Sequence, residues 1–339
     1  KNGVAQNLTD GSTLAKVNAI CIDGGVLYAA GAEKVSGGRW KGVLWKDGQP
    51  TYFTEEIGTE VTGLYVKEGK YIIEGNMTAD SGDIVTCIWT EEGVQVISEG
   101  MALCQGTGLA VAGSDIYVAG NAYDMDYDTY EEIYRSPVWK NGTELYTLTD
   151  GTNDAWAYAV CVSDGTVYAA GYERQSDRIV AKVWENGTLK YTPGAPGADS
   201  YAYSVFAANG SLYTAGSEES GGALTAKIWK DGDALYAYSV SPAVSQARSV
   251  CVSGGDVYAA GSLQSGLTKP LAVVWKNDKA HYTLSDGETP AGVNALCLSG
   301  RTLYAAGHSG GAAAVWKDKE LLYTLTDGSS YAEATAVCR

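Results

Sequence analysis

Short apolar segments alternate with tight polar turns along the whole chain. In residues 157–194 the apolar segments are AYAVCV, VYAAGY, IVAKVW and LKYTPG, which we call a, b, c and d. The turns SDGT and ENGT join a to b and c to d. Asp-Gly and Asn-Gly between alternating apolar segments are typical of type I′ hairpins, whose central residues need positive φ. The sequence shows no apolar period near 3.6 of helical length. The pattern therefore predicts antiparallel hairpins.

This four-segment unit repeats along the chain with a period near 46 residues. A Tyr of segment b is found at Tyr28, Tyr71, Tyr117, Tyr168, Tyr213, Tyr258 and Tyr304. Each is followed by a Trp that ends segment c, at Trp45, Trp89, Trp139, Trp184, Trp229, Trp275 and Trp316. Four antiparallel strands in a unit of this length indicate a β-propeller blade. We interpret the repeated aromatic residues as packing that holds one blade against the next.

Seven copies of segments b and c predict an all-β fold, a seven-bladed β-propeller of four-stranded antiparallel blades, as a single domain over residues 1–339. Segments a and d occur eight times, because residues 1–11 match the end of a unit and residues 321–338 supply a further d and a. We interpret this surplus as a ring closed by strands from both termini. The alternatives are eight blades with one incomplete, and a segment of a longer array.

Three stretches carry a resemblance to a known group of proteins. They are VYAAGYE from Val167, VWKNGTELYTLTDGT from Val138 and VWKDKELLYTLTDGS from Val315. Their unit resembles that of uncharacterised bacterial tandem-repeat β-propeller proteins with a YAAG…VWKNG…LTDG unit, and the similarity covers essentially the whole chain. The resemblance implies a propeller fold and a bacterial surface or secreted setting. It implies no catalytic residues.

The connections of the repeat differ in how much they vary. The interval from each Trp to the next Tyr is 26 to 29 residues, whereas the interval from each Tyr to its own Trp is 12 to 22. Variation is thus concentrated in the b–c loops, which share one rim of an antiparallel meander with the d–a connections. Binding usually resides in variable loops held by a rigid scaffold. We therefore predict that the b–c/d–a rim is the functional face.

One variable position recurs in segment a, three residues before the position of a repeated Cys. It reads Asn18, Val61, Thr107, Tyr158, Tyr203, Arg248, Asn294 and Thr335, and a small residue always follows. Small residues suit a crowded inner strand, so we expect the variable residue to ring the mouth of a central channel. A small polar or sugar ligand could use such groups through stacking and hydrogen bonds. The predicted ligand-binding residues here are Asn18, Trp156, Tyr158, Tyr203, Arg248 and Asn294.

The longest b–c loop, residues 121–137, is rich in Tyr and acidic residues. Tyr127 and Tyr130 are further ligand-binding candidates, because Tyr is common in binding surfaces. Asp124, Asp126 and Asp128 resemble the start of a calcium loop. Thr129 stands where such a loop needs Gly, and Arg135 stands where it needs Glu. We expect a solvated acidic loop and no cofactor, with calcium as the alternative.

Charge and composition exclude several classes of function. The formal net charge of −16 disfavours binding to nucleic acid and to anionic membranes. The sequence contains no run of about 18 apolar residues, so we predict no membrane insertion. Only two His are present, and no nucleophile elbow, phosphate-binding loop or CxxC pair occurs, so we predict that the chain is not an enzyme. Five of the seven Cys share one repeat position, which indicates buried packing rather than a disulfide framework. That pattern fits a reducing cytoplasm or an anaerobe's exterior.

The sequence thus predicts a non-enzymatic binding module, extracellular or at the cell surface, with a cytoplasmic location as the alternative. Its b–c/d–a rim would meet a glycan or protein ligand. Two other functions remain open: a polysaccharide-acting hydrolase or lyase with its site at the channel mouth, and a structural repeat segment of a larger surface protein. The VYAAGYE segment itself is expected to be structural, with Gly171 ending its strand.

Overall fold

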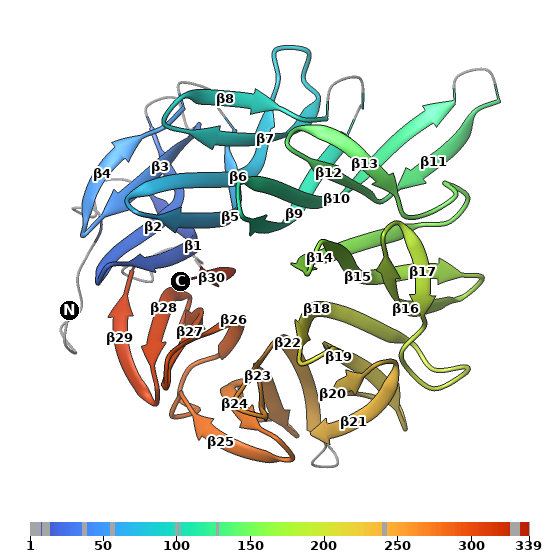
Figure 1. Cartoon of the computed structure of the whole chain (residues 1–339). Helices are drawn as coiled ribbons and strands as arrows, with labels where there is room; N and C mark the ends of the chain where they lie inside the picture. Colours follow the sequence, from blue (N-terminus) through green and yellow to red (C-terminus); the bar gives the residue numbers. More distant parts are fainter. Residues whose placement is uncertain are drawn as a thin grey trace.

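The computed structural model describes Leu8 and residues 14–35, 39–54, 58–98, 101, 103–126, 129–238, 243–325 and 333–338. Throughout these ranges the regular secondary structure is β-strand, arranged as antiparallel meanders in a ring around a central axis (Figure 1). The predicted all-β propeller is confirmed. In the described part of the chain no helix is long and apolar enough to span a membrane.

The described strands group into seven meanders of the predicted a–b–c–d order. The first two are β1 (Ala15–Asp23), β2 (Val26–Lys34), β3 (Trp40–Lys46), β4 (Gln49–Tyr52) and β5 (Glu60–Lys67), β6 (Lys70–Thr78), β7 (Ile84–Thr90), β8 (Gly93–Val96). The third is β9 (Leu103–Ala112), β10 (Asp115–Asp126), β12 (Pro137–Lys140), β13 (Thr143–Thr147), with β11 (Glu131–Arg135) paired to the outer half of β10. A single parallel residue pair between β7 and β9 joins the second and third meanders into one sheet.

The remaining four meanders are separate four-stranded sheets. The fourth and fifth are β14 (Ala155–Ser163), β15 (Thr166–Gln175), β16 (Arg178–Glu185), β17 (Thr188–Tyr191) and β18 (Ser200–Ala208), β19 (Ser211–Ser220), β20 (Ala223–Lys230), β21 (Asp233–Tyr238). The sixth and seventh are β22 (Ala243–Ser253), β23 (Asp256–Ser265), β24 (Leu271–Lys276), β25 (Lys279–Thr283) and β26 (Ala291–Ser299), β27 (Thr302–Ser309), β28 (Ala312–Lys317), β29 (Glu320–Thr324).

The C-terminal strand β30 (Ala336–Cys338) lies parallel to β1, with Ala19 opposite Ala336 and Cys21 opposite Cys338 (Figure 1). The surplus segment a is therefore added beside the first inner strand. Most of residues 1–11 lie outside the described residues, so closure by strands from both termini stays a prediction.

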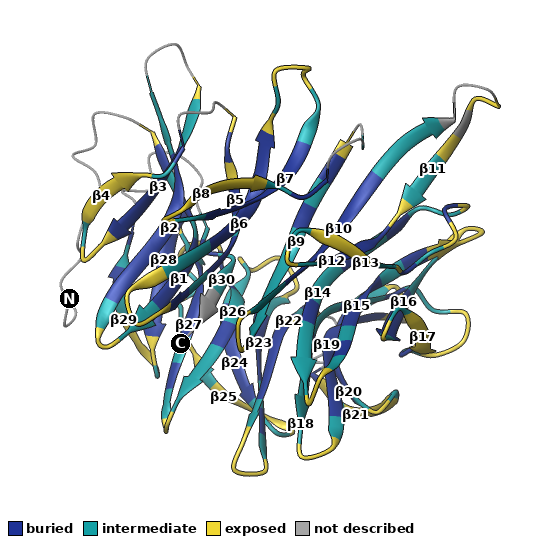
Figure 2. Ribbon diagram, turned by 45° about the horizontal axis from the view of Figure 1, so that its top comes forward, coloured by how far each residue is buried: buried dark blue, intermediate teal, exposed yellow. Residues whose placement is uncertain are grey.

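The predicted turn chemistry is present, and the turn side chains have a second task. Asn186 and Gly187 adopt φ of 48° and 80° between β16 and β17. The Asn186 Oδ1 also accepts a hydrogen bond from the Val167 backbone N at 3.0 Å, which fixes the start of β15. The same bond to the start of strand b is made by Asp47, Asn141, Asp231, Asn277 and Asp318. The recurring Asn or Asp thus shapes one hairpin and anchors a neighbouring strand. Figure 2 shows the exposed turns at the ends of buried strands.

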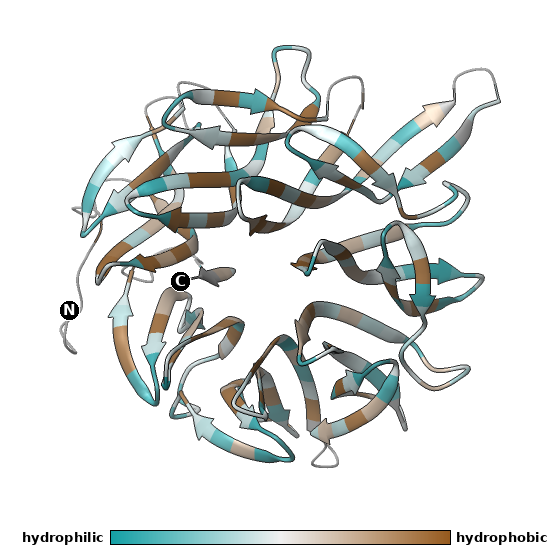
Figure 3. Cartoon of the chain, viewed as in Figure 1, coloured by the Kyte–Doolittle hydropathy of each residue, from teal (hydrophilic) through white to brown (hydrophobic). Residues whose placement is uncertain are grey.

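The repeated Trp residues pack between neighbouring meanders, as predicted. Each is at most 3% exposed. Trp184 of the fourth meander, for example, shares a core cluster with Tyr117 and Val138 of the third. Apolar positions follow the inner strands around the ring in Figure 3. The predicted repeat Tyr of the second unit is wrong by one residue. Ile72 lies opposite Tyr65 as Tyr28 lies opposite Cys21, whereas Tyr71 lies one residue earlier in its strand, opposite Val66.

The cysteines differ from expectation in one respect. Cys87, Cys104 and Cys251 are buried thiols outside any disulfide, and Cys161 and Cys297 are half-buried thiols outside any disulfide. Cys21, however, is disulfide-bonded. The predicted absence of a disulfide framework therefore has one exception, at the innermost strand of the first meander.

Candidate functional site

The variable position of segment a projects into the central channel because each inner strand carries a β-bulge there. In β14 the pairing with β15 shifts between Ala157 and Ala159, which leaves Tyr158 unpaired between them. A bulge bends its strand and re-aims the side chain of the extra residue. The same shift lies at Asn18, Thr62, Thr107, Tyr203, Arg248 and Asn294. The prediction of a ring of variable residues was made from spacing alone, without the bulge that causes it.

The glycine of the YAAG segment is required by this bulge. Gly171 lies opposite Ala157, and a Cβ on Gly171 would meet the Trp156 carbonyl oxygen at 1.9 Å. Only a residue without a side chain allows the two backbones to approach so closely. The prediction that Gly171 ends its strand is wrong, because β15 continues to Gln175. The segment is structural, and its glycine lets the facing strand direct a side chain into the channel.

The mouth of the channel is a cavity of about 230 Å³. Its described lining residues include the bulged side chains Thr62, Thr107, Tyr158, Tyr203, Arg248 and Asn294, together with Thr335 and the small residues that follow them. Thr62 takes the place predicted for Val61, which is fully buried. The prediction was one residue off here because the second unit had been aligned on Tyr71. Asn18 is half-buried, and its backbone oxygen accepts a hydrogen bond from Thr335 Oγ1 at 2.6 Å. The structure thus brings Tyr158, Tyr203, Arg248 and Asn294 together at the mouth, whereas the predicted Asn18 and Trp156 are not among its described lining residues.

Aromatic side chains from the fourth and fifth meanders form a continuous cluster beside this mouth. Tyr158 lies 5.3 Å from Tyr203 between ring centroids, and Tyr201 stacks on Tyr203 at 5.7 Å. Tyr172 contacts both Tyr158 and Tyr201, at 5.9 and 5.7 Å. Trp156 extends the cluster outward, 6.4 Å from Tyr158. Burial raises the pKa of Tyr158, Tyr172 and Tyr201, so these phenols stay neutral at physiological pH. The cluster offers apolar faces and neutral hydroxyl groups.

Arg248 is the only charged residue among the described residues that line this mouth. Its guanidinium lies 4.5 Å from the centroid of the Tyr203 ring and donates a hydrogen bond to Gln246 Oε1 at 2.9 Å. The side chain is exposed, so its remaining donors face solvent. On the next inner strand the Asn294 amide donates to Glu333 Oε2 at 3.1 Å. Stacking on Tyr203 holds the positive charge in place in a chain of net charge −16.

Behind Thr62, the channel wall contains a fully buried carboxyl group, Glu74. Thr62 Oγ1 donates to Glu74 Oε2 at 2.5 Å, while Glu74 Oε1 has no hydrogen-bond partner among the described residues. Burial raises the pKa of Glu74 to about 8, the Thr62 hydrogen bond opposes that rise, and Glu60 adds to it. The carboxyl is therefore mostly protonated at neutral pH. Sequence reasoning missed it because Glu74 occupies a position that is Ala in most units.

The long third loop is a β10–β11 hairpin that projects outward from the ring (Figure 1). Tyr130, predicted to bind ligand, is 77% exposed and follows the end of β10, so it is not brought to the channel mouth. Tyr127 and Asp128 lie outside the described residues. Asp124 Oδ1 accepts a hydrogen bond from the Met125 backbone N at 2.8 Å. In the parts of the chain that are described, no three His, Cys, Asp or Glu residues group as metal ligands. The calcium alternative at Asp124, Asp126 and Asp128 stays a prediction.

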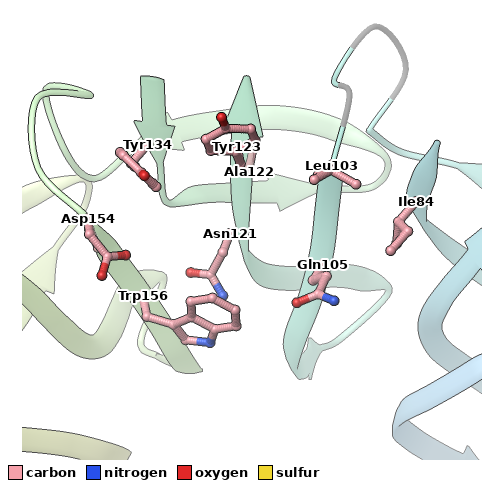
Figure 4. A pocket seen from close by; sticks show the side chains of 10 residues that line it. Ile84, Leu103, Gln105, Asn121, Ala122, Tyr123, Tyr134, Asp154 and Trp156 are labelled. Atoms are coloured by element: carbon pink, nitrogen blue, oxygen red, sulfur yellow. The ribbon is translucent and has the colours of Figure 1, made fainter. Parts of the chain in front are cut away.

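A second cavity, of about 210 Å³, lies beside the channel between the third meander and the start of β14. Its lining is Ile84, Leu103, Gln105, Asn121, Ala122, Tyr123, Tyr134, Asp154, Ala155 and Trp156. Figure 4 shows Asn121, Gln105 and Trp156 at one end of this pocket, and Tyr123 and Tyr134 at the other. We call it the β10 pocket. Sequence reasoning selected Trp156 but not the pocket, whose walls come from three meanders.

Comparison with known proteins gives the fold alone. No protein-family model and no curated protein matches the sequence. The structure is similar to the Dos1 propeller at 12% identity and a TM-score of 0.55, over 99% of this chain and 89% of that one. It is similar to the Pyrococcus horikoshii acylaminoacyl peptidase at 10% identity and a TM-score of 0.59, over 96% of this chain and 54% of that one. It is also similar to a Mycobacterium tuberculosis puromycin-hydrolyzing peptidase at 12% identity and a TM-score of 0.60, over 92% of this chain and 54% of that one.

This chain thus spans about half the length of the two peptidases. The finding corrects the predicted function. The similar structures include propeller domains of peptidases, so the predicted binding module that presents a variable rim to a glycan or protein is wrong.

Proposed function

We propose that this chain is a substrate-handling propeller domain for a peptide-hydrolysing domain or partner, and that its channel mouth holds the carboxylate end of a peptide. The observation that carries the proposal is Arg248, an exposed guanidinium fixed on Tyr203 in an otherwise uncharged described lining. A guanidinium matches the geometry of a carboxylate and binds it through paired hydrogen bonds. The structural similarity to peptidases supports the choice of a peptide as the ligand.

The surroundings of Arg248 suit a peptide chain. Hydroxyl and amide groups of Thr107, Asn294 and Thr335 line the same mouth and can bond backbone groups. The neighbouring Tyr cluster presents apolar faces for side chains of the peptide.

We propose that the groups that break the bond lie outside this chain, which acts by binding. The described residues of the mouth include no carboxylate, imidazole or thiol among the lining side chains. Acyl transfer needs a nucleophile and a base within hydrogen-bond reach of each other. The domain would therefore orient the peptide, and the hydrolytic unit would supply the chemistry.

We further propose that the seven described meanders are the complete blades of a tandem-repeat ring in a bacterial extracellular protein. The disulfide bond of Cys21 supports an extracellular setting, because disulfides persist in oxidising compartments and are rare in the cytosol. The bacterial source rests on the resemblance of the repeat unit. The alternative of a reducing cytoplasm is disfavoured by the same bond.

The test compares the peptide Ala-Ala-Phe as a free acid and as its C-terminal amide, by isothermal titration calorimetry. We expect the acid to bind about tenfold more tightly, from one charge-assisted interaction worth about 1.4 kcal/mol. Arg248→Gln should abolish the difference. Arg301→Gln makes the same charge change in the exposed turn between β26 and β27 at the other rim, and should leave it intact. Equal affinity of acid and amide for the unmodified protein would refute the proposal.

A further inference from the structure

Asn121 at one end of the β10 pocket has an amide whose orientation is fixed. It is 7% exposed, and its Oδ1 accepts a hydrogen bond from the Ala157 backbone N at 2.7 Å. Because only the oxygen of an amide can accept, Nδ2 must point the other way. Among the described residues Nδ2 has no hydrogen-bond partner. A buried donor without a partner is destabilising, so it marks a place where an acceptor is missing.

A matched residue one meander earlier shows what a satisfied amide looks like at this position. Asn76 follows the glycine of its strand b as Asn121 does, and its Oδ1 accepts from the Gly106 backbone N at 2.8 Å. The Asn76 Nδ2 then donates to the Gly106 carbonyl oxygen at 3.3 Å. Ala157 occupies the place of Gly106 in the next inner strand, yet Asn121 makes only the first of these two bonds.

The bulged threonines beside the two amides make different hydrogen bonds. Thr107 Oγ1 donates to the Ala157 carbonyl oxygen at 2.5 Å, so that carbonyl is already bonded by another side chain. In the second meander the corresponding Thr62 donates to Glu74 instead, which leaves the Gly106 carbonyl to Asn76. The unpaired donor of Asn121 is thus a consequence of its neighbours.

We infer that the β10 pocket binds an apolar amino-acid side chain of a peptide, with a peptide carbonyl oxygen accepting a hydrogen bond from Asn121 Nδ2. This inference rests on the proposed function, because the residue bound is taken to belong to the peptide at the channel mouth. Trp156 connects the two places, since it lines the pocket and contacts Tyr158 of the channel. Binding in this way requires the half-buried Trp156 and Gln105 side chains to rotate and open Nδ2 to the ligand.

The pocket fits this ligand in size and polarity. A cavity of about 150 Å³ accepts benzene, so about 210 Å³ holds the side chain of Leu or Phe. Its walls are the apolar or aromatic Ile84, Leu103, Ala122, Tyr123, Tyr134 and Trp156. The one carboxylate of the described lining, Asp154, is paired with Arg174 at 3.5 Å, so the pocket offers no free charge.

The test measures binding of N-acetyl-L-phenylalanine amide, a neutral probe without the carboxylate that Arg248 would bind. Asn121→Asp keeps an acceptor for the Ala157 N and removes the donor. At pH 8, by calorimetry or chemical-shift titration, we expect the affinity to fall at least about tenfold. Ala122→Leu, which fills the pocket without touching Asn121, should also weaken binding. N-acetyl-L-serine amide should bind the unmodified protein at least about tenfold more weakly than the phenylalanine probe.

Ser262→Ala is the matched control, because Ser262 holds the same strand position in the sixth meander. It should leave the affinity unchanged. If Asn121→Asp and Ala122→Leu both bind the probe as the unmodified protein does, the inference is overturned. The neutral probe does not depend on Arg248, whose binding of a carboxylate is tested by the acid and amide peptides. A failure of the pocket inference can therefore be told apart from a failure of the proposed function.

Discussion

The buried carboxyl of Glu74 makes the stability of this fold depend on pH in a way that one substitution should remove. Glu74 is fully buried, and burial raises its pKa from 4.5 to about 8. Between these values the folded chain holds a proton that the unfolded chain has lost. Linkage then requires stability to fall as pH rises from about 4.5 to 8 and to level off above 8. Glu74→Gln keeps the shape and has no proton to lose.

The size of the effect follows from the interval between the two pKa values. Each pH unit in that interval costs about 1.4 kcal/mol, so the full range corresponds to about 5 kcal/mol. That is a large share of the stability of a typical domain, which is about 5–15 kcal/mol. The unmodified protein should therefore become much easier to unfold by pH 8, while Glu74→Gln should keep most of this stability.

The assay is urea unfolding from pH 5 to pH 8.5, followed by fluorescence of the buried Trp residues. The quantity of interest is the difference in the free energy of unfolding between Glu74→Gln and the unmodified protein at each pH. We expect it to grow in favour of Glu74→Gln as pH rises. Glu92→Gln removes an exposed carboxylate nearby in sequence, and its profile should parallel that of the unmodified protein. Parallel profiles for Glu74→Gln as well would refute the reasoning.

Three further predictions concern the repeat and its closure. Gly171→Ala should cost about 3 kcal/mol of stability in urea unfolding, because its Cβ would strike backbone, whereas Gly165→Ala, in open space at φ 78°, should cost about 1 kcal/mol. Asn186→Ala should cost about 2 kcal/mol in the same assay through loss of the turn conformation and of the bond to strand b. Peptide mapping without reductant should recover Cys21 linked to Cys338, its neighbour in backbone register. Reduction of this bond should lower the free energy of unfolding by about 3 kcal/mol. A Cys21 peptide recovered without a linked partner would contradict the prediction.

The architecture could be predicted from the sequence because its determinants are local and repeated. Each Asn-Gly or Asp-Gly pair fixes a hairpin by itself, and seven buried Trp residues mark where one meander packs on the next. Prediction was wrong where one unit departs from the others. In the second unit the Tyr lies one residue earlier in its strand than in the first, so alignment on Tyr71 assigned to Tyr71 and Val61 the places that Ile72 and Thr62 hold.

The candidate site was predictable in position but not in geometry. Spacing alone selected Tyr158, Tyr203, Arg248 and Asn294, and the structure brings them to one channel mouth. The cause, a bulge opposite a glycine, involves two strands at once and leaves no mark that spacing can reveal. The Cys21 disulfide was missed for a related reason, since β30 joins β1 from the far end of the chain.

The β10 pocket shows most clearly why hydrogen bonding in a repeat protein cannot be derived one unit at a time. Asn76 and Asn121 hold the same place in the repeat, yet among the described residues only the Asn76 Nδ2 has a hydrogen-bond partner. That difference is set by whether the neighbouring threonine donates to the backbone carbonyl or to Glu74. The state of Asn121 thus depends on Thr107, which does not line the pocket.

This dependence gives a prediction at a distance from the ligand. Thr107→Val removes the hydroxyl that donates to the Ala157 carbonyl oxygen and leaves that oxygen open to Asn121 Nδ2, as the Gly106 oxygen is to Asn76. The donor would then be satisfied within the protein, so N-acetyl-L-phenylalanine amide should bind several-fold more weakly, by up to about tenfold. Thr107→Ser keeps the hydroxyl and should bind as the unmodified protein does. Equal weakening by both threonine variants would indicate a packing effect and contradict the explanation given for the unpaired amide.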